Sequence, residues 1–219
     1  MIYGIGYIDP SKRYAPVEGW YEKCILFHSK KYHKILETTV IPQDTICIDA
    51  ETGVTETHKR IISNYFKGSR MFINIGAAGA VTGRPYTPAI GDVVQASVVL
   101  PTAGLARLIT NEFPLKNEGD PLPKIPQVTV QCLPTLYYDK RFLVADATCV
   151  EQESEAVAAT CMWLNKNYGE KYGKCFYANI FYISDTVHRD NRPWKDTLKM
   201  YEHTRDIYRK KVLDIALSS

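Results

Sequence analysis

An acidic segment with the sequence VEQESEA opens a run of helical periodicity, and its carboxylates are candidates for chemistry. Its acids are Glu151, Glu153 and Glu155. Acids in the first turn of a helix are also favoured by the helix dipole, which explains them without any function. Both explanations stay open at this point.

A second acid, Asp185, follows the apolar run Phe181-Tyr182-Ile183 and the polar Ser184. In open α/β sheets, ligands bind beyond the carboxyl ends of strands, so an aspartate at this position is better placed for chemistry than most. An aspartate that caps the start of a helix is the alternative explanation.

A third segment, NIGAAGA at residues 74–80, is rich in small residues and follows a strand-like run. Gly91-Asp92 then precedes another strand-like run. Glycines let a ligand approach the backbone closely, although tight packing explains such a segment equally well. The GxGxxG spacing of a dinucleotide-binding turn is absent, and no helical pattern clearly follows.

The elements that must position these segments alternate between strand-like and helical patterns. We expect strands at residues 2–7, 24–28, 45–48, 71–75, 92–100, 127–133, 142–146 and 177–183, and helices at about 55–66, 151–167 and 193–217. The segment Pro101–Pro126 contains five prolines, which predicts an extended loop. The alternation predicts an α/β fold with a parallel or mixed sheet, and 219 residues are enough for one well-buried domain.

Taken together, the three segments resemble the nucleoside phosphorylase and nucleosidase superfamily, which includes purine and uridine phosphorylases and methylthioadenosine/S-adenosylhomocysteine nucleosidase. Its pattern is a GSAGG or GSCGA turn, then GD before a strand, VEMEA opening a helix, and a strand ending in SD. The counterparts here are Gly76–Ala80, Gly91-Asp92, Val150–Ser154 and Ser184-Asp185, in the same order, within roughly residues 70 to 215. The resemblance implies a single three-layer α/β/α domain over residues 1–219, with a central mixed β-sheet.

The resemblance also implies roles for individual residues. Glu153 falls on the glutamate that accepts hydrogen bonds from ribose hydroxyls, and Gln152 takes the place of the usual methionine beneath the sugar. Asp185 falls on the acid that protonates or hydrogen-bonds N7 of a purine as the bond from C1′ to the base breaks, and Ser184 is expected to orient it.

Tyr137 and Tyr138 follow a strand where relatives cover the base with an aromatic ring, so either is a candidate for base stacking. In a chain with 15 tyrosines, an ordinary core role is about equally expected for them. Gly76 and Ala77, in the small-residue segment, complete the expected substrate contacts.

The chain departs from the pattern where the attacking group is bound. Relatives that are phosphorylases carry an arginine just before the glycine turn and a serine within it, whereas this chain has Asn74 and Ala77. Hydrolases carry a glutamate after the first strand, where this chain has the sequence DPSKR at residues 9–13. Asp9 is therefore a candidate base, and Arg13 a candidate phosphate ligand.

The spacing departs as well, because Asp185 follows Glu153 by 32 residues, several more than the family has. A surface insertion at residues 167–174, which would leave the site intact, is the expected cause.

The leading expectation is an enzyme that hydrolyses the N-glycosidic bond of a purine nucleoside and releases the free base. A phosphorylase that forms ribose 1-phosphate, with inorganic phosphate as co-substrate, is the close alternative. A nucleoside-binding protein with impaired catalysis is a second alternative, and a redox enzyme of Rossmann type is a distant third. No other cofactor and no metal are expected, because the six cysteines form no CxxC pair and no histidines cluster.

The composition argues against nucleic-acid and membrane partners. The formal net charge is +3, and the basic residues are scattered except for Arg209-Lys210-Lys211, which suits the last turn of a helix. Neither a signal peptide nor an apolar run of about 18 residues is present, so a cytoplasmic protein is expected. Most cysteines stand next to apolar residues in the sequence, which predicts that they are small core residues. The resemblance implies a homo-oligomer, with Pro101–Pro126, His33 or Arg70 as candidates at its interface.

Overall fold

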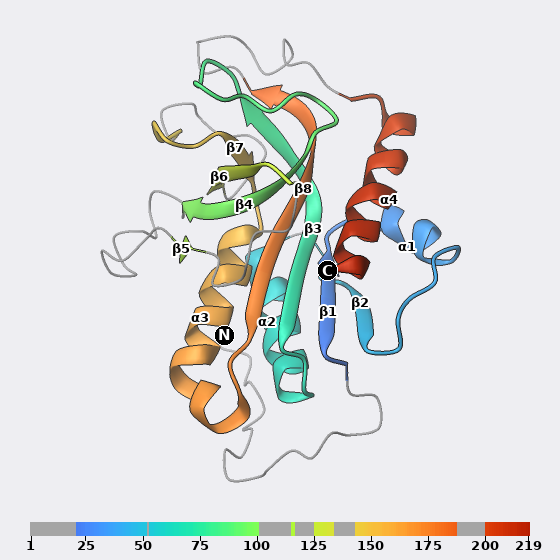
Figure 1. The fold of residues 1–219 in the computed structure, drawn as a ribbon, viewed down its shortest axis with the longest axis vertical. Coiled ribbons are helices and arrows are strands. Elements are labelled where there is room, and N and C mark those ends of the chain that lie inside the picture. The colour runs from blue at the N-terminus through green and yellow to red at the C-terminus, as the bar shows by residue number, and fades with distance from the viewer. Residues whose placement is uncertain (1–20, 52, 101–114, 117–124, 134–142, 188–199) are drawn as a thin grey trace.

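The computed structural model describes residues 21–51, 53–100, 115–116, 125–133, 143–187 and 200–219 (Figure 1). Its strands are β1 (Lys23–Phe27), β2 (Thr45–Asp49), β3 (Met71–Val81), β4 (Val93–Leu100), β5 (Leu115–Lys116), β6 (Gln127–Cys132), β7 (Cys149–Glu151) and β8 (Phe176–Val187). Its helices are α1 (Lys31–Leu36), α2 (Val54–Phe66), α3 (Ser154–Tyr172) and α4 (Glu202–Ser218). The predicted α/β class is confirmed, and the strand predicted at residues 2–7 lies outside the described residues.

One mixed sheet contains all the described strands, with the long parallel pair β3 and β8 at its centre (Figure 1). The edge of β3 that faces away from β8 pairs in parallel with β1 near its start and with β7 at Gly79 and Ala80, and β1 pairs in turn with β2. From β7 the sheet continues through β6 to β4, which pairs with β8. Strands β3, β7, β6, β4 and β8 therefore form a closed ring at one end of the molecule, in which the β7 and β8 edges of β3 are connected through β6 and β4.

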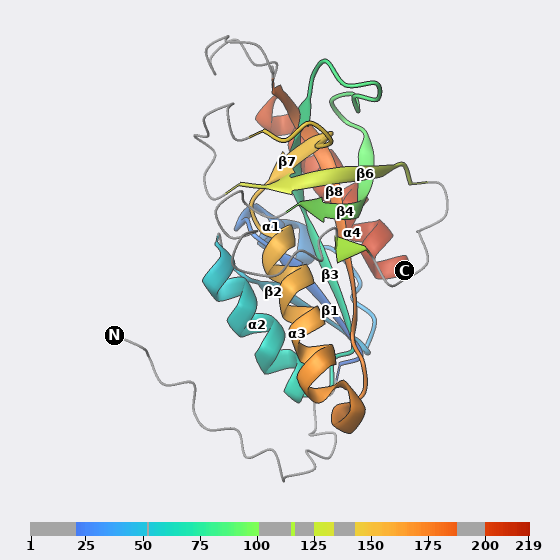
Figure 2. The same cartoon turned by 90° about the vertical axis from the view of Figure 1, so that its left-hand side faces the viewer.

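Helices cover both faces of the sheet around β1 and β3. Helices α2 and α3 lie together on one face, and α1 and α4 lie on the other (Figures 1 and 2). The first face buries Ile61 and Val157 against Phe72. The second buries Tyr32 and Val212 with Ile73. Successive residues of a strand point to opposite faces, so strands covered on both faces need the nearly continuous apolar runs seen here.

The described cysteines are free thiols, all buried except the half-buried Cys47. Their predicted role as core residues is therefore confirmed. None of the helices in the described ranges combines the length and apolarity needed to cross a membrane.

Both central strands are longer than predicted. The small-residue segment Gly76–Ala80 continues β3 instead of forming a turn, because it pairs with β8 along its length and with β7 at Gly79 and Ala80. Ser184 and Asp185 likewise lie inside β8, which continues to Val187. Pairing between distant segments, which local sequence does not encode, produces both extensions.

Three other predictions of element boundaries were wrong. Residues 143–146 of the strand predicted at 142–146 form no strand, and β7 forms instead at Cys149–Glu151, where it pairs with both β3 and β6. Helix α3 begins at Ser154 rather than Glu151, since Glu151 belongs to β7. Leu115–Lys116 pair with β4, so that part of the predicted loop is a short strand.

The extra length between the two motif acids is helical rather than a surface loop. Helix α3 runs through Gly169 to Tyr172 because Tyr168 and Tyr172 pack edge-on against Phe66 of α2. Asn165 then fixes the return to β8, since its amide both donates to and accepts from the backbone of Cys175. Helix α4 begins at Glu202 in the described residues, and 193–199 of the predicted helix lie outside them.

The Gly91-Asp92 motif has a steric basis. Gly91 has φ +93°, and a Cβ there would lie 2.5 Å from the hydroxyl oxygen of Tyr208 on α4. Its N–H donates to the carbonyl of Ile183, and Asp92 accepts from the N–H of Ala89. A glycine therefore lets this turn join β4, β8 and α4 at close range.

We expect Gly91→Ala to lower the free energy of unfolding by about 2–4 kcal/mol, because it adds backbone strain and a clash with Tyr208. The measurement is denaturant unfolding. Gly83→Ala is the matched control: it also has a positive φ, +75°, but its Cβ would meet nothing within 4 Å. Equal losses in the two variants would show that contact with Tyr208 is not the constraint.

Candidate functional site

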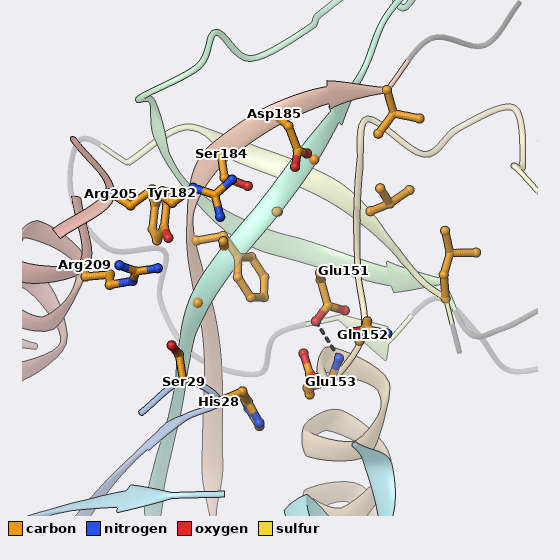
Figure 3. A pocket seen from close by; sticks show the side chains of 18 of the residues that line it. His28, Ser29, Glu151, Gln152, Glu153, Tyr182, Ser184, Asp185, Arg205 and Arg209 are labelled. Carbon is orange, nitrogen blue, oxygen red and sulfur yellow. Dashed lines mark hydrogen bonds between the residues drawn. The ribbon is translucent and has the colours of Figure 1, made fainter. Parts of the chain in front are cut away.

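A cavity of about 470 Å³ lies beside the carboxyl-terminal ends of β1, β3, β7 and β8, between α3 and α4 (Figure 3). It brings together six of the residues singled out from the sequence: Gly76, Ala77, Gln152, Glu153, Ser184 and Asp185. The other four candidates, Asp9, Arg13, Tyr137 and Tyr138, lie outside the described residues. Segments more than 70 residues apart in the chain thus line one cavity.

Strand register brings the two acidic segments together. Gly79 of β3 pairs with Val150 of β7 on one side and with Asp185 of β8 on the other. A Cβ at Gly79 would lie 2.6 Å from Oδ1 of Asp185 and 2.9 Å from Cγ2 of Val187. Gly79 therefore provides the space that the Asp185 side chain occupies, which explains a glycine in the small-residue segment.

A bulge in β8 turns its polar residues toward the cavity. The register of β3 against β8 shifts between Ala78 and Gly79, where Ile183 pairs with Ala78 but Asp185, not Ser184, pairs with Gly79. Such an extra residue re-aims the side chains beside it. The carbonyl of Ser184 accepts a hydrogen bond from the N–H of Met200 at 2.7 Å, which secures the bulge before α4.

Glu151 caps helix α3, so the helix-dipole explanation applies to this acid rather than to Glu153. Its buried carboxylate accepts hydrogen bonds from the N–H groups of Glu153, at 2.6 Å, and Ser154, at 3.0 Å. It also accepts one from the thiol of Cys132 at 3.1 Å. These contacts satisfy free N–H groups at the helix start, a task that usually falls to the N-cap residue itself.

Glu153 is the N-cap residue by position, yet its side chain makes no capping bond and lines the cavity instead (Figure 3). Burial raises the pKa of Glu153 to about 7, and hydrogen bonds from the N–H groups of Gly53 and Gln152 counteract part of that rise. Burial, followed by the charge of Glu153, also raises the pKa of Glu151 to about 7. Two adjacent buried carboxyl groups therefore titrate near neutrality.

His28, which follows β1, holds the segment around Glu51, which is close in sequence to the Gly53 N–H that donates to Glu153. Its Nδ1 lies 2.6 Å from the carbonyl oxygen of Glu51 and therefore donates to it. Its Nε2 lies 2.8 Å from Oδ1 of Asn74, whose amide donates to the buried Asn179. Asn74, where phosphorylase relatives carry arginine, thus belongs to a buried polar chain.

Cations reach the cavity from a different element. Arg205 and Arg209, one turn apart on α4, line its side opposite Glu151 and Glu153 (Figure 3). The sequence had placed Arg209 in a basic run at the end of a helix. That expectation was wrong, because Arg209 lies in the middle of α4 and is 6% exposed.

Several lining residues were missed from the sequence, namely His28, Ser29, Tyr32, Tyr182, Arg205 and Arg209. The spacing of the two arginines was a usable signal, since residues four apart share a helix face. His28 ends the strand predicted at residues 24–28 and Ser29 follows it, so the rule applied to Asp185 could have identified both. Two residues proposed for a subunit interface have partners in their own chain: Arg70 donates to the carbonyls of Tyr65 and Tyr172, and His33 pairs with Asp49.

Comparison with known proteins identifies the fold. No family model matches the sequence, and no curated protein matches it. Among solved structures, the purine nucleoside phosphorylase of Toxoplasma gondii in complex with immucillin-H aligns with a TM-score of 0.64 at 12% identity, over 91% of each chain.

Two bacterial nucleosidases align equally well. The Streptococcus pneumoniae MTA/SAH nucleosidase in complex with 8-aminoadenine has a TM-score of 0.63 and 17% identity, over 90% of this chain and 98% of that one. The Campylobacter jejuni 5′-methylthioadenosine/S-adenosylhomocysteine nucleosidase has a TM-score of 0.61 and 12% identity, over 90% and 97%. The chain therefore has the fold of the nucleoside phosphorylases and nucleosidases, as its sequence motifs predicted.

Proposed function

We propose that this protein hydrolyses the N-glycosidic bond of a purine nucleoside and releases the free base. One observation carries the proposal: Glu153 and Asp185, from two elements that meet only in the tertiary structure, line one cavity on either side of the glycine-bearing strand β3. The solved structures with the same fold are a nucleoside phosphorylase and nucleosidases.

Glu153 is the proposed ribose ligand. Its carboxylate faces the cavity and is held by the N–H groups of Gly53 and Gln152, which leaves acceptor positions for two sugar hydroxyls. A carboxylate held in place before the substrate arrives loses little entropy on binding. Gln152, also at the cavity, is proposed to contact the sugar from below.

Asp185 is the proposed acid for the leaving base. Breaking the bond at C1′ leaves a positive, oxocarbenium-like sugar and puts negative charge on the base, so a proton delivered to N7 lowers the barrier. Ser184, displaced by the bulge beside it, is proposed to orient the carboxyl group. Tyr137 or Tyr138 is proposed to stack on the base.

Water is the proposed nucleophile. Asn74 and Ala77 stand where phosphorylase relatives carry an arginine and a serine, so the phosphate contacts of that pattern are absent at these positions. Phosphorolysis is the second candidate, because Arg205 and Arg209 bring two guanidinium groups to the same cavity. The proposal includes one α/β/α domain, a cytoplasmic homo-oligomer, no cofactor, and neither a nucleic-acid nor a membrane partner.

Asp185→Asn is expected to lower kcat for inosine or adenosine by roughly 10²- to 10⁴-fold, because asparagine cannot donate the proton. The assay measures free base, and separates free ribose from ribose 1-phosphate with and without phosphate. Asp214→Asn, an exposed aspartate at the end of α4, is the control and should keep wild-type turnover.

A second substrate, a 4-nitrophenyl riboside, separates an acid role of Asp185 from a structural role, because its leaving group needs no proton. Asp185→Asn should cleave it at close to the wild-type rate if the residue acts as the acid. A loss as large as that for inosine would assign Asp185 a structural role. Unchanged cleavage of inosine by the variant would contradict the mechanism.

Glu153→Ala is expected to raise KM for the nucleoside by roughly 10- to 100-fold, because the hydroxyls lose charge-assisted hydrogen bonds. Wild-type protein should bind a nucleoside far more tightly than its 2′,3′-dideoxy analogue, and the variant should bind both alike. Glu155→Ala, in the same helical turn, is the control. A preference for ribose that survives in Glu153→Ala would place the sugar elsewhere.

The raised pKa of Glu153 predicts pH-dependent sugar binding. Above about pH 7 the carboxylate is ionised and accepts both hydroxyls, and below it the protonated group loses acceptor capacity. KM should therefore rise as pH falls from 8 to 6, in steady-state assays at constant ionic strength. Glu153→Gln should flatten the profile, and a KM profile with the same slope in that variant would rule Glu153 out as its source.

A further inference from the structure

We infer that the α4 side of the cavity is a subsite for a phosphate group, formed by Arg205, Arg209, Tyr32 and Ser29. All four line the cavity, and they come from α4, from α1 and from the turn after β1. Figure 3 shows Arg205, Arg209 and Ser29 among them. Glu151 and Glu153 lie across the cavity from the two arginines, and Asp185 lies beside Ser184 (Figure 3). The arginines and the glutamate pair thus occupy different sides of the cavity.

The cations of this wall point inward, while their acidic partners stay outside. Arg209 donates to Asp206 at 2.6 Å and to Glu202 at 3.2 Å, and Arg205 lies 3.6 Å from Glu202. The side chains of Asp206 and Glu202 are 57% and 56% exposed, whereas those of Arg209 and Arg205 are 7% and 24% exposed. Neither acid lines the cavity, so water screens the carboxylates while the guanidinium groups face the enclosed space.

Two buried polar atoms on this wall lack partners. The hydroxyl of Tyr32, a residue that is 2% exposed, and Nε of Arg205 have no hydrogen-bond partner among the residues that the structure describes. A buried polar group without a partner is unfavourable, so a wall with two of them favours a ligand that supplies one. Nε–H of Arg205 can only donate, and the hydroxyl of Tyr32 can donate as well as accept, so one ligand that accepts hydrogen bonds can satisfy both.

Phosphate fits this donor set better than a smaller acceptor. Two guanidinium groups supply planar sets of N–H donors, and the hydroxyls of Tyr32 and Ser29 add two more. A tetrahedral dianion has enough oxygens to use donors from three elements at once, while a single carbonyl oxygen has not. Two sources share this chemistry: free inorganic phosphate, and the phosphate ester of a nucleotide.

The inference rests on the proposed function only in placing a nucleoside beside this wall. The test therefore measures binding without turnover, by calorimetry with the full chain at constant ionic strength. Inorganic phosphate, inosine and inosine 5′-monophosphate are titrated separately. Glu153→Gln should weaken inosine and leave inorganic phosphate unchanged, which separates failure of the ribose site from failure of this subsite.

Arg205→Gln should weaken the phosphate-bearing ligand by about tenfold or more, because it removes a charge-assisted donor. Tyr32→Phe should weaken it by about threefold or more without lowering stability, since the hydroxyl it removes has no partner among the described residues. Lys210→Gln is the matched control, because Lys210 lies on the same helix and pairs with Asp214 outside the cavity. The control should bind as the wild type does.

Comparison of inorganic phosphate with inosine 5′-monophosphate shows which source of phosphate the subsite binds. Binding of inorganic phosphate that weakens in Arg205→Gln supports a free co-substrate. Tighter binding of the monophosphate than of inosine, lost in Arg205→Gln and without binding of free phosphate, supports a nucleotide ester. The inference is overturned if neither ligand binds through phosphate, or if Arg205→Gln and Tyr32→Phe bind both ligands as the control does.

Discussion

The site depends on the close packing of three strands at Gly79. Strand β3 has β7 on one side and β8 on the other, and the pairing of Gly79 with Val150 and Asp185 sets the distance between the two acidic segments. Any side chain at Gly79 would enter the space of the Asp185 carboxyl group. Backbone pairing in the sheet thus places Asp185 of β8 and the end of β7, which leads into Glu153, on the two sides of Gly79.

The closed ring of strands makes this packing possible. An open sheet would leave β4 and β6 far from β8, whereas here β4 pairs with β8 and completes the circuit through β6 and β7. Strand β7, which ends at Glu151, pairs with β3 shortly before α3 begins. Helix α3 consequently begins at the cavity, where Glu151 caps it and Glu153 is free to face a ligand.

Separation of charge follows from the same arrangement. The acids come from strand ends and from the start of α3, and the arginines come from α4, which packs on the opposite face of the sheet beside Tyr182. Burial raises the pKa of the carboxyl pair Glu151 and Glu153 to about 7. The cavity therefore has a carboxyl pair on one side and two guanidinium groups on another.

The sequence by itself determined the α/β class, the order of most elements and six residues of the cavity, because strands, helices and short motifs leave local signals. Glu153 and Asp185 were recognisable from the residues around them. Local patterns could not show that Gly76–Ala80 and Ser184-Asp185 extend strands, nor that Cys149–Glu151 forms one, since those assignments need partners from distant segments. Only the tertiary structure decided that Glu151 rather than Glu153 caps α3, and that Arg205 and Arg209 face the acids across one cavity. The physical reason is that register, ring closure and helix packing join residues far apart in the chain, and no local periodicity records those contacts.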